Sequence, residues 1–263
     1  MGISTGFSDL DDRLEGLCPS DLILIAARPF MGKTTFATDI ARHALIEQKR
    51  SVLFLSLEAP KWHILTRLFS EVQLNSELLS GERGSKLNIE IIAEPGISIS
   101  DIFDKCRWYK RDNEVELIII DYLELITSDK KFESRLQEIY EVFRSLKALA
   151  VELDVPVVVT SQLGRTLEQR PDKRPVLSDL AECVVQNADT ILFIYRDEYY
   201  NEDTEEPGVA EINIAKQKSG IVGTVKLAWL PKLLKYYRNS NDEYYADDVK
   251  NLYTFADLDS SDL

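Results

Sequence analysis

The sequence predicts an α/β fold with a mostly parallel, doubly wound sheet and antiparallel strands at one edge. Two observations support this prediction. Short apolar runs alternate with longer stretches whose apolar residues recur at helical spacing, which is typical of strand–helix–strand units. The last apolar stretches, at 209–216, 222–229 and 233–238, follow one another without an intervening helix, which indicates an antiparallel edge.

The elements follow in order from these patterns. Six apolar runs are predicted as strands of the parallel part of the sheet, at 22–27, 51–57, 89–93, 117–121, 156–161 and 190–195. After a short helix within residues 1–20, longer helices are expected at about 33–48, from Pro60 to about 72, from Ser98 or Ser100 to 111, and at about 133–153. Residues 74–88 are polar and predict a loop or weak helix.

Composition and charge narrow the class of protein. The chain has 263 residues, of which 44% are hydrophobic and 29% charged, as in soluble globular proteins. Its net charge of −14 argues against a protein that coats nucleic acid with its whole surface. Residues 241–263 hold seven acids and one base, so we expect a domain over 1–238 followed by an acidic, loosely ordered tail over 239–263.

Other sequence features point to the cytoplasm. No apolar run approaches the roughly 20 residues that a membrane-spanning helix needs, and the chain does not start like a secretory signal. Cys18, Cys106 and Cys183 lack metal or redox spacing and predict free thiols in a reducing compartment. The two histidines, His43 and His63, are too few and too scattered for a metal site.

The stretch from Leu22 to Thr35 predicts a phosphate-binding loop between a buried strand and a helix. Gly32-Lys33-Thr34 matches the end of the pattern G-x-x-x-x-G-K-[ST], although Ala27 replaces the first glycine. Backbone N–H groups would cradle phosphates, Lys33 would reach the β- and γ-phosphates of ATP, and the Thr34 hydroxyl would hold Mg²⁺. The residues expected to bind the nucleotide are Ala27, Arg28, Pro29, Phe30, Met31, Gly32, Lys33, Thr34 and Thr35. The alternative is an ordinary strand–turn–helix.

Polar residues that close other strands add to this site, because ligands bind at the carboxyl ends of parallel strands. Asp121 follows four apolar residues and would hold Mg²⁺; its alternative role is a cap for the next turn. Glu58 would orient the attacking water, or else is a helix-start acid. Gln162 would sense the γ-phosphate, although amides are frequent at strand ends. Together these residues make a stronger case than any one alone.

Several motifs in order resemble the motor domain of DnaB-type replicative helicases, a RecA-like P-loop NTPase fold. They are Gly6-Phe-Ser-Asp-Leu-Asp, Ala27-Arg-Pro-Phe-Met-Gly-Lys-Thr, Phe54-Leu-Ser-Leu-Glu, Ile120-Asp-Tyr-Leu-Glu-Leu, Thr160-Ser-Gln-Leu-Gly-Arg, Gln169-Arg-Pro-Asp-Lys-Arg-Pro and Ala215-Lys-Gln-Lys-Ser-Gly. Alanine in place of the first loop glycine is also usual in this family. The resemblance runs from about Gly2 to Arg238, without the family's amino-terminal domain and linker helix.

The resemblance implies a ring-shaped homo-hexamer that hydrolyses ATP at subunit interfaces and moves 5′ to 3′ along single-stranded DNA. It assigns Lys33 and Thr34 to phosphate and Mg²⁺. It assigns Glu58 to the attacking water, Asp121 to Mg²⁺ and Gln162 to sensing of the γ-phosphate. A primase or a helicase loader would be a further partner.

Three departures from the family pattern bear on function. Phe30 stands where the loop usually carries serine and should alter the loop rim more than its phosphate grip. Lys218, with Lys216 nearby, stands where the family has an arginine that reaches the neighbour's ATP; lysine lacks the bidentate fork, so we expect weaker activation in trans. Ala181 stands where the family has an arginine, and the pore-lining loop that follows is about two residues shorter than the family's glycine-serine loop, so DNA contacts should be reduced.

The sequence leaves three hypotheses. The first is an ATP-driven helicase motor whose DNA contacts come from Glu182 and from the basic residues Arg165, Arg170, Lys173 and Arg174; the basic residues could instead form a solvated, ion-paired loop. The second is a DnaB-like regulatory or adaptor ATPase that no longer translocates. The third, a RecA-like recombinase or clock-type ATPase, is disfavoured by the motifs at 121–125 and 169–175.

Overall fold

The computed structural model describes residues 2–69, 88–218, 221–230 and 235–237. Over these residues it has one nine-stranded sheet in the order β3-β2-β4-β5-β1-β6-β7-β8-β9. The strands are β1 (Leu22–Ala27), β2 (Val52–Ser56), β3 (Ile89–Ala93), β4 (Leu117–Asp121), β5 (Val157–Gln162), β6 (Thr190–Tyr195), β7 (Val209–Lys216), β8 (Gly223–Leu230) and β9 (Lys235–Tyr237).

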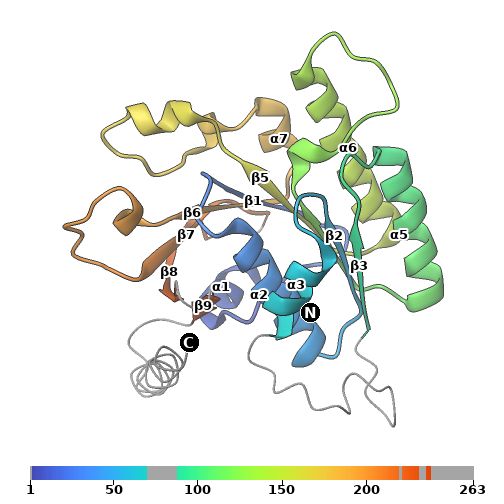
Figure 1. Cartoon of the computed structure of the whole chain (residues 1–263), viewed down its shortest axis with the longest axis horizontal. Coiled ribbons are helices and arrows are strands. Elements are labelled where there is room, and N and C mark those ends of the chain that lie inside the picture. Colours follow the sequence, from blue (N-terminus) through green and yellow to red (C-terminus); the bar gives the residue numbers. More distant parts are fainter. Residues whose placement is uncertain (1, 70–87, 219–220, 231–234, 238–263) are drawn as a thin grey trace, which may run out of the picture.

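Strands β1 to β6 pair in parallel, whereas β7, β8 and β9 extend the sheet by antiparallel pairing from β6. Figure 1 shows these antiparallel strands gathered at one side of the sheet, with β2 and β3 at the other. This confirms the predicted α/β fold with a mostly parallel sheet and an antiparallel edge.

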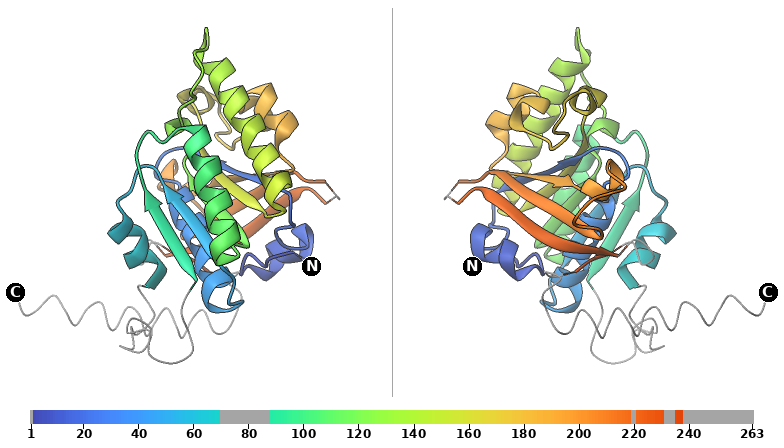
Figure 2. Two further views of the ribbon diagram at one scale, coloured as in Figure 1. Left: turned by 90° about the vertical axis from the view of Figure 1, so that its right-hand side faces the viewer. Right: turned by 90° about the vertical axis from the view of Figure 1, so that its left-hand side faces the viewer.

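Helices cover both faces of the sheet. They are α1 (Ser8–Leu14), α2 (Lys33–Ile46), α3 (Lys61–Phe69), α5 (Ile99–Asn113), α6 (Arg135–Leu153) and α7 (Glu182–Asn187). Short 3₁₀ turns follow several strands, at Leu123–Leu125, Arg165–Gln169, Leu177–Asp179 and Asp197–Tyr199. Figure 2 shows α5 and α6 on one face, with α1 and α3 away from them.

The two faces have separate cores because alternate side chains of each buried strand point to opposite sides. On one face Phe36 and Ile40 of α2 pack with Leu10 of α1 and with sheet residues. On the other face Phe143 and Leu146 of α6 lead a second cluster that includes α5 and α7. The parallel strands β1, β2, β4 and β6 are buried on both faces, which is why their sequences are almost continuous apolar runs rather than alternating ones; β3, at the end of the sheet, is only partly buried.

Most predicted elements agree with the structure to within two or three residues. The strands at 89–93, 117–121 and 190–195 have the predicted bounds. Ser98 caps α5, because its side chain accepts a hydrogen bond from the Asp101 N–H at 3.1 Å. Most of the loop or weak helix predicted at 74–88, and the tail predicted at 239–263, lie outside the described residues. The boundary at 238 remains a prediction.

The register of the sheet brings the predicted strand ends together. Ala27 at the end of β1 is paired with Gln162 of β5, and Ser56 at the end of β2 is paired with Asp121 of β4. Glu58 follows two residues after Ser56. The residues predicted to bind and hydrolyse ATP therefore meet where the parallel strands end, at their carboxyl-terminal side. Among the described helices, none combines the length and apolar character needed to cross a membrane.

Candidate functional site

The turn between β1 and α2 has the shape of an anion-binding helix start. Gly32 caps α2 with φ 93°, a left-handed conformation that favours glycine, and the helix begins at Lys33. The first N–H groups of a helix have no partner within the helix, and the helix dipole places partial positive charge there. No acid lies in the first turn of α2, so the helix start itself carries no negative charge that would repel a phosphate.

Asp121 joins this turn to the end of β4. Its Oδ2 accepts a hydrogen bond from Thr34 Oγ1 at 2.7 Å, and its Oδ1 accepts one from Thr160 Oγ1 at 2.5 Å. The carboxylate is 1% exposed. The two side chains predicted to hold Mg²⁺ are therefore in direct contact, although they are 87 positions apart.

These oxygens suit Mg²⁺, which takes one or two protein ligands and fills its other positions with water and nucleotide phosphates. The described residues contain no group of three or more His, Cys, Asp or Glu side chains that could hold a metal ion by themselves. A metal at this site would thus depend on the phosphates as well as on Thr34 and Asp121.

Lys33 lies mostly buried beside three carboxylates. Burial lowers the pKa of its ammonium, while the charges of Asp121, Glu124 and Glu58 act in the opposite direction. The lysine thus stands within electrostatic reach of all three of these carboxylates. Its place, immediately after Gly32 at the start of α2, is where a phosphate-binding lysine is needed.

Glu124 belongs to the site, although no role for it was apparent from the sequence. Its Oε1 accepts hydrogen bonds from Ser161 Oγ at 2.5 Å and from the Gln162 N–H at 3.0 Å. Burial is the main cause that raises the pKa of this carboxyl group. The signal in the sequence was an acid three residues after Asp121, within the same motif.

Glu58 and Gln162 are both exposed at the open side of this edge. Gln162 is the last residue of β5, and its backbone N–H is fixed by Glu124. Glu58 follows β2 and is close enough to contribute to the electrostatic environment of Lys33. Both side chains are therefore accessible to a nucleotide, as their predicted roles require.

Several other residues of the predicted loop have side chains that point into the protein. Ala27, Met31 and Thr35 are buried. Arg28 turns into the protein, where its Nε donates to Glu168 and its Nη1 to the Leu163 carbonyl, both at 2.8 Å. Side chains turned inward in this way shape the loop, and any contact they make with phosphate would come from their backbone.

Phe30 is the most exposed large apolar residue at the loop, with 80% of its surface accessible. Its φ of 64° lies in the left-handed region, which is unfavourable for a side chain with a Cβ. Arg196 Nη1 donates a hydrogen bond to the Phe30 carbonyl at 3.3 Å, and this contact helps to hold the turn. Phe30 therefore forms the rim of the loop, as its departure from the family pattern suggested.

Lys216 and Lys218 lie near the amino-terminal ends of the parallel strands, whereas the phosphate loop lies at their carboxyl-terminal ends. The end of β7 pairs with Ile191, near the amino end of β6. Lys216 Nζ donates to the carbonyls of Val185 and Ala188 at 2.7 and 2.6 Å. These carbonyls belong to the carboxyl-terminal part of α7 and its cap.

Lys218 forms ion pairs with Asp21 and, at 3.1 Å, with Asp189. Burial acts to lower the pKa of Lys218, but the hydrogen bonds to these two carboxylates outweigh it and raise the pKa. Within one chain, neither Lys216 nor Lys218 reaches the phosphate loop. A role for either one in catalysis requires a second copy of the chain.

The residues proposed for DNA contact are largely engaged within the chain. Arg170 pairs with Asp179 at 2.8 Å. Arg174 pairs with Glu211 at 2.6 Å and stacks on the Tyr195 ring at 4.6 Å. The ion-paired alternative thus describes Arg170 and Arg174 in this structure.

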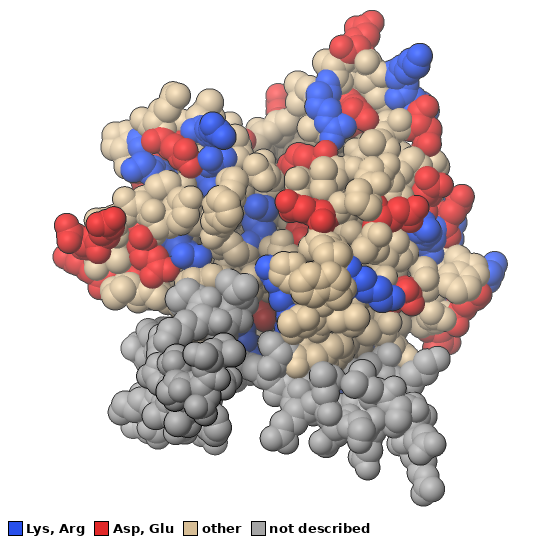
Figure 3. All heavy atoms as spheres, viewed as in Figure 1, with Lys and Arg blue, Asp and Glu red and all other residues tan. Residues whose placement is uncertain are grey.

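The other three candidates are less constrained. Lys173 lies over the Tyr200 ring at 5.1 Å, whereas Arg165 and Glu182 are exposed. Figure 3 shows acidic and basic groups interspersed over the face in view, rather than one broad basic stripe. On this face, a DNA contact would therefore come from a few local side chains rather than from a continuous basic surface.

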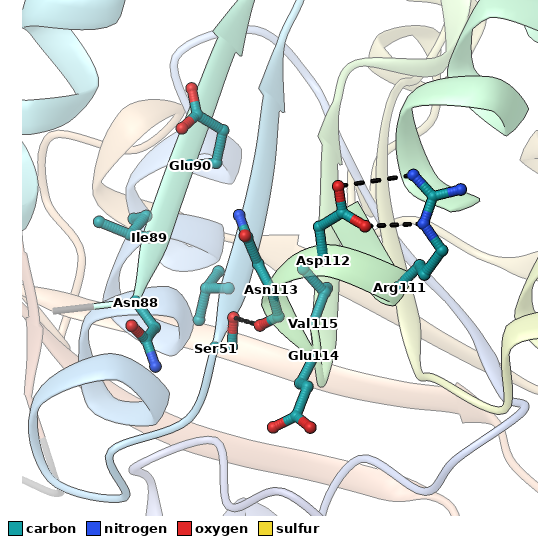
Figure 4. A pocket seen from close by; sticks show the side chains of 10 residues that line it. Ser51, Asn88, Ile89, Glu90, Arg111, Asp112, Asn113, Glu114 and Val115 are labelled. Carbon is teal, nitrogen blue, oxygen red and sulfur yellow. Dashed lines mark hydrogen bonds and ion pairs between the residues drawn. The ribbon is translucent and has the colours of Figure 1, made fainter. Parts of the chain in front are cut away.

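A polar cavity of about 470 Å³ lies at the end of the sheet opposite to the phosphate loop (Figure 4). Ser51, Asn88 and Glu114 are among its lining residues, near the starts of β2 and β3 and the end of α5. Arg111, the cation in its wall, is paired with Asp112 at 2.7 Å. This cavity lies away from the strand ends that form the candidate nucleotide site.

Comparisons with known proteins agree with this geometry. The family model described as "DnaB-like helicase C terminal domain" matches residues 2–238. The replicative DNA helicase DnaB of Haemophilus influenzae is 42% identical over 94% of the chain and 57% of the relative. That of Geobacillus stearothermophilus is 43% identical over 89% of the chain and 56% of the relative. The chain thus spans a little over half the length of these relatives.

Solved structures show the same fold. One of them, described as an ATPase domain, superposes with a TM-score of 0.82 at 36% identity and covers 91% of this chain and 92% of its own. A DnaB-like replicative helicase, solved in a study of its interactions with primase, gives a TM-score of 0.81 at 37% identity, over 91% of this chain and 62% of its own. With its RecA-like sheet and its phosphate loop facing Asp121, the chain belongs to the DnaB-like helicase carboxy-terminal domain family.

Proposed function

We propose that this chain is the ATP-hydrolysing motor of a replicative DNA helicase and moves 5′ to 3′ along single-stranded DNA. The observation that carries the proposal is the hydrogen bond between Thr34 and Asp121, which joins the phosphate loop to the carboxylate of β4. The names of the relatives, replicative DNA helicases, support the same activity.

In this proposal ATP binds with its phosphates at the start of α2 and with Mg²⁺ beside Thr34 and Asp121. Lys33 neutralises charge on the β- and γ-phosphates. Mg²⁺ would supply charge neutralisation on the transferred phosphoryl group. Glu58 orients the attacking water, and Gln162 responds to the loss of the γ-phosphate.

The proposal includes a ring of identical subunits, a homo-hexamer. The positions of Lys216 and Lys218 support it, because both are remote from the chain's own nucleotide site yet close to the surface. In a ring, Lys218 of one subunit would face the nucleotide of the next. Since Lys218 is held by Asp21 and Asp189, it would have to exchange these partners for a phosphate.

The proposed partners are single-stranded DNA and a primase or a helicase loader, within the cytoplasm. Arg165, Lys173 and Glu182 are the better DNA candidates, because Arg170 and Arg174 are already paired. The relative solved in a study of its interactions with primase supports a primase partner.

Lys33→Ala tests the motor. It should abolish ATP hydrolysis, because the charge on the β- and γ-phosphates is lost. Lys130→Ala is the matched control: Lys130 is 73% exposed in its side chain and pairs at 3.4 Å with Glu141, so turnover should be unchanged. Turnover by Lys33→Ala at the unaltered rate would contradict the proposed site.

DNA binding is tested separately by fluorescence anisotropy with a labelled single strand and a non-hydrolysable ATP analogue. A motor should bind with an affinity that falls as salt rises, because phosphate contacts release counterions. If no binding occurs even at low salt while ATP is still hydrolysed, the translocating motor is excluded. The result would favour a regulatory ATPase instead.

A further inference from the structure

The last described strand, β9, lies directly against the phosphate loop. Tyr236, in the middle of β9, is 2% exposed. Its hydroxyl donates a hydrogen bond to the Met31 carbonyl at 2.6 Å. Burial raises the pKa of this phenol well above its usual range, so the hydroxyl stays protonated and remains a donor. This contact joins two residues that are 205 positions apart.

The position of Tyr236 is itself fixed by several contacts. Its backbone N–H donates to Asp39 Oδ2 of α2 at 2.9 Å. Its ring meets Phe36 edge-on at 5.3 Å and Trp229 at 4.8 Å. The hydroxyl is therefore held in place by the same helix whose start forms the phosphate site.

The geometry of the peptide bond gives this contact a consequence at the opposite side of the loop. In a trans peptide the carbonyl of one residue and the N–H of the next point in opposite directions. Because Tyr236 draws the Met31 carbonyl towards the core, the N–H of Gly32 must point away from the core, on the side where phosphate would lie. A hydrogen bond to the carbonyl also polarises the same peptide group and strengthens its N–H as a donor.

Gly32 is constrained by the same side chain. A Cβ at this position would collide with the Tyr236 hydroxyl, and the backbone is in the left-handed region. Glycine thus lets the loop approach Tyr236 closely enough for the hydrogen bond. The loop and the tyrosine are fitted to each other.

We propose that Tyr236 is a positioning residue of the nucleotide site, whose hydroxyl orients the Met31–Gly32 peptide so that the Gly32 N–H binds a phosphate oxygen of ATP. The inference rests on the proposed function, because it assumes that ATP binds at this loop. It assigns the antiparallel edge of the sheet a part in phosphate binding.

Tyr236→Phe, made in the 263-residue chain, removes the hydroxyl and keeps the buried ring. The matched control is Tyr195→Phe, because the Tyr195 hydroxyl is also on a buried ring and donates at 2.8 Å, but to Asp197. For each variant we would measure the Kd of a fluorescent non-hydrolysable ATP analogue, the Kd of ADP, and the melting temperature without nucleotide.

Tyr236→Phe should raise the Kd of both nucleotides by about tenfold, because one charge-assisted hydrogen bond to phosphate becomes poorly oriented. Tyr195→Phe should lower the melting temperature about as much as Tyr236→Phe does, because each loses one hydroxyl hydrogen bond on a buried ring. It should leave the Kd of both nucleotides within about twofold of the values for the unaltered chain. If Tyr236→Phe changed only the melting temperature, the tyrosine would be structural and the inference wrong. If the unaltered chain failed to bind either nucleotide, the proposed function would fall together with it.

Discussion

Asp189 offers a quantitative test of how the amino-terminal edge of the sheet is held together. The residue is 8% exposed. Its carboxylate accepts hydrogen bonds from the Leu22 N–H at 2.7 Å and from Lys147 at 2.6 Å, and it pairs with Lys218 at 3.1 Å. Asp189→Asn would keep one acceptor oxygen for Leu22 and remove the negative charge that faces the two lysines.

The expected cost can be assembled from these contacts. The hydrogen bond to Lys147 is partly buried and charged, and such bonds contribute about 1.5–3 kcal/mol. Lys218 is 55% exposed in its side chain, so its contribution should be about 0–1 kcal/mol. We therefore expect Asp189→Asn to lower the free energy of unfolding by about 1.5–4 kcal/mol. For a domain of this size the melting temperature should fall by roughly 3–16 °C.

Urea unfolding followed by circular dichroism measures this change. Asp104→Asn is the matched control: its side chain is 79% exposed and lies 3.7 Å from Arg107, so the loss should stay within about 0.5 kcal/mol. Burial acts to raise the pKa of Asp189, but Lys147, the Leu22 N–H and Lys218 outweigh it and lower the pKa. Its stabilisation is thus present above about pH 4 and is lost as the pH falls further. An Asp189→Asn variant as stable as the control near pH 7 would refute this reasoning.

Two further predictions concern the nucleotide site and α2. Glu58→Gln should bind ATP with nearly unchanged affinity and stop hydrolysis, as measured by analogue binding and phosphate release; normal turnover would show that Glu58 does not orient the water. Burial raises the pKa of Asp39 to about 7, so the folded chain binds more protons and loses stability as the pH rises from about 4 to 7. The free energy of unfolding of Asp39→Asn, relative to that of the unaltered chain, should therefore rise by about 1–3 kcal/mol between about pH 5 and pH 8, as measured by urea unfolding. The same dependence of the free energy of unfolding on pH in both proteins would contradict this.

The parallel part of the fold was predictable because a strand buried on both faces has an unbroken apolar sequence. This made β1, β4 and β6 recognisable to the residue. The meeting of Thr34 with Asp121 followed from the same fact, since parallel strands end at one edge. Local capping was also visible, as Ser98 shows.

Contacts between distant segments were not predictable in the same way. The hydrogen bond from Tyr236 to Met31 depends on where β9 lies beside α2, and no local pattern records that position. The inward turn of Arg28 depends on Glu168, which lies 140 positions away. Glu124 was missed for another reason: an acid after a strand resembles an ordinary turn residue until its hydrogen-bond partners, the Ser161 hydroxyl and the Gln162 N–H, are known.

The hydrogen bonds between Leu22 and Asp189 at the start of β1 have a mechanical consequence. Leu22 exchanges two hydrogen bonds with Asp189, one with its side chain and one with its backbone, and the same carboxylate pairs with Lys218. From there six residues, or about 20 Å of strand, lead to the phosphate loop. Because β1 is paired with β5 over its whole length and with β6 from Ile23 to Ala26, the strand is a stiff connection between the Asp189 carboxylate and the loop.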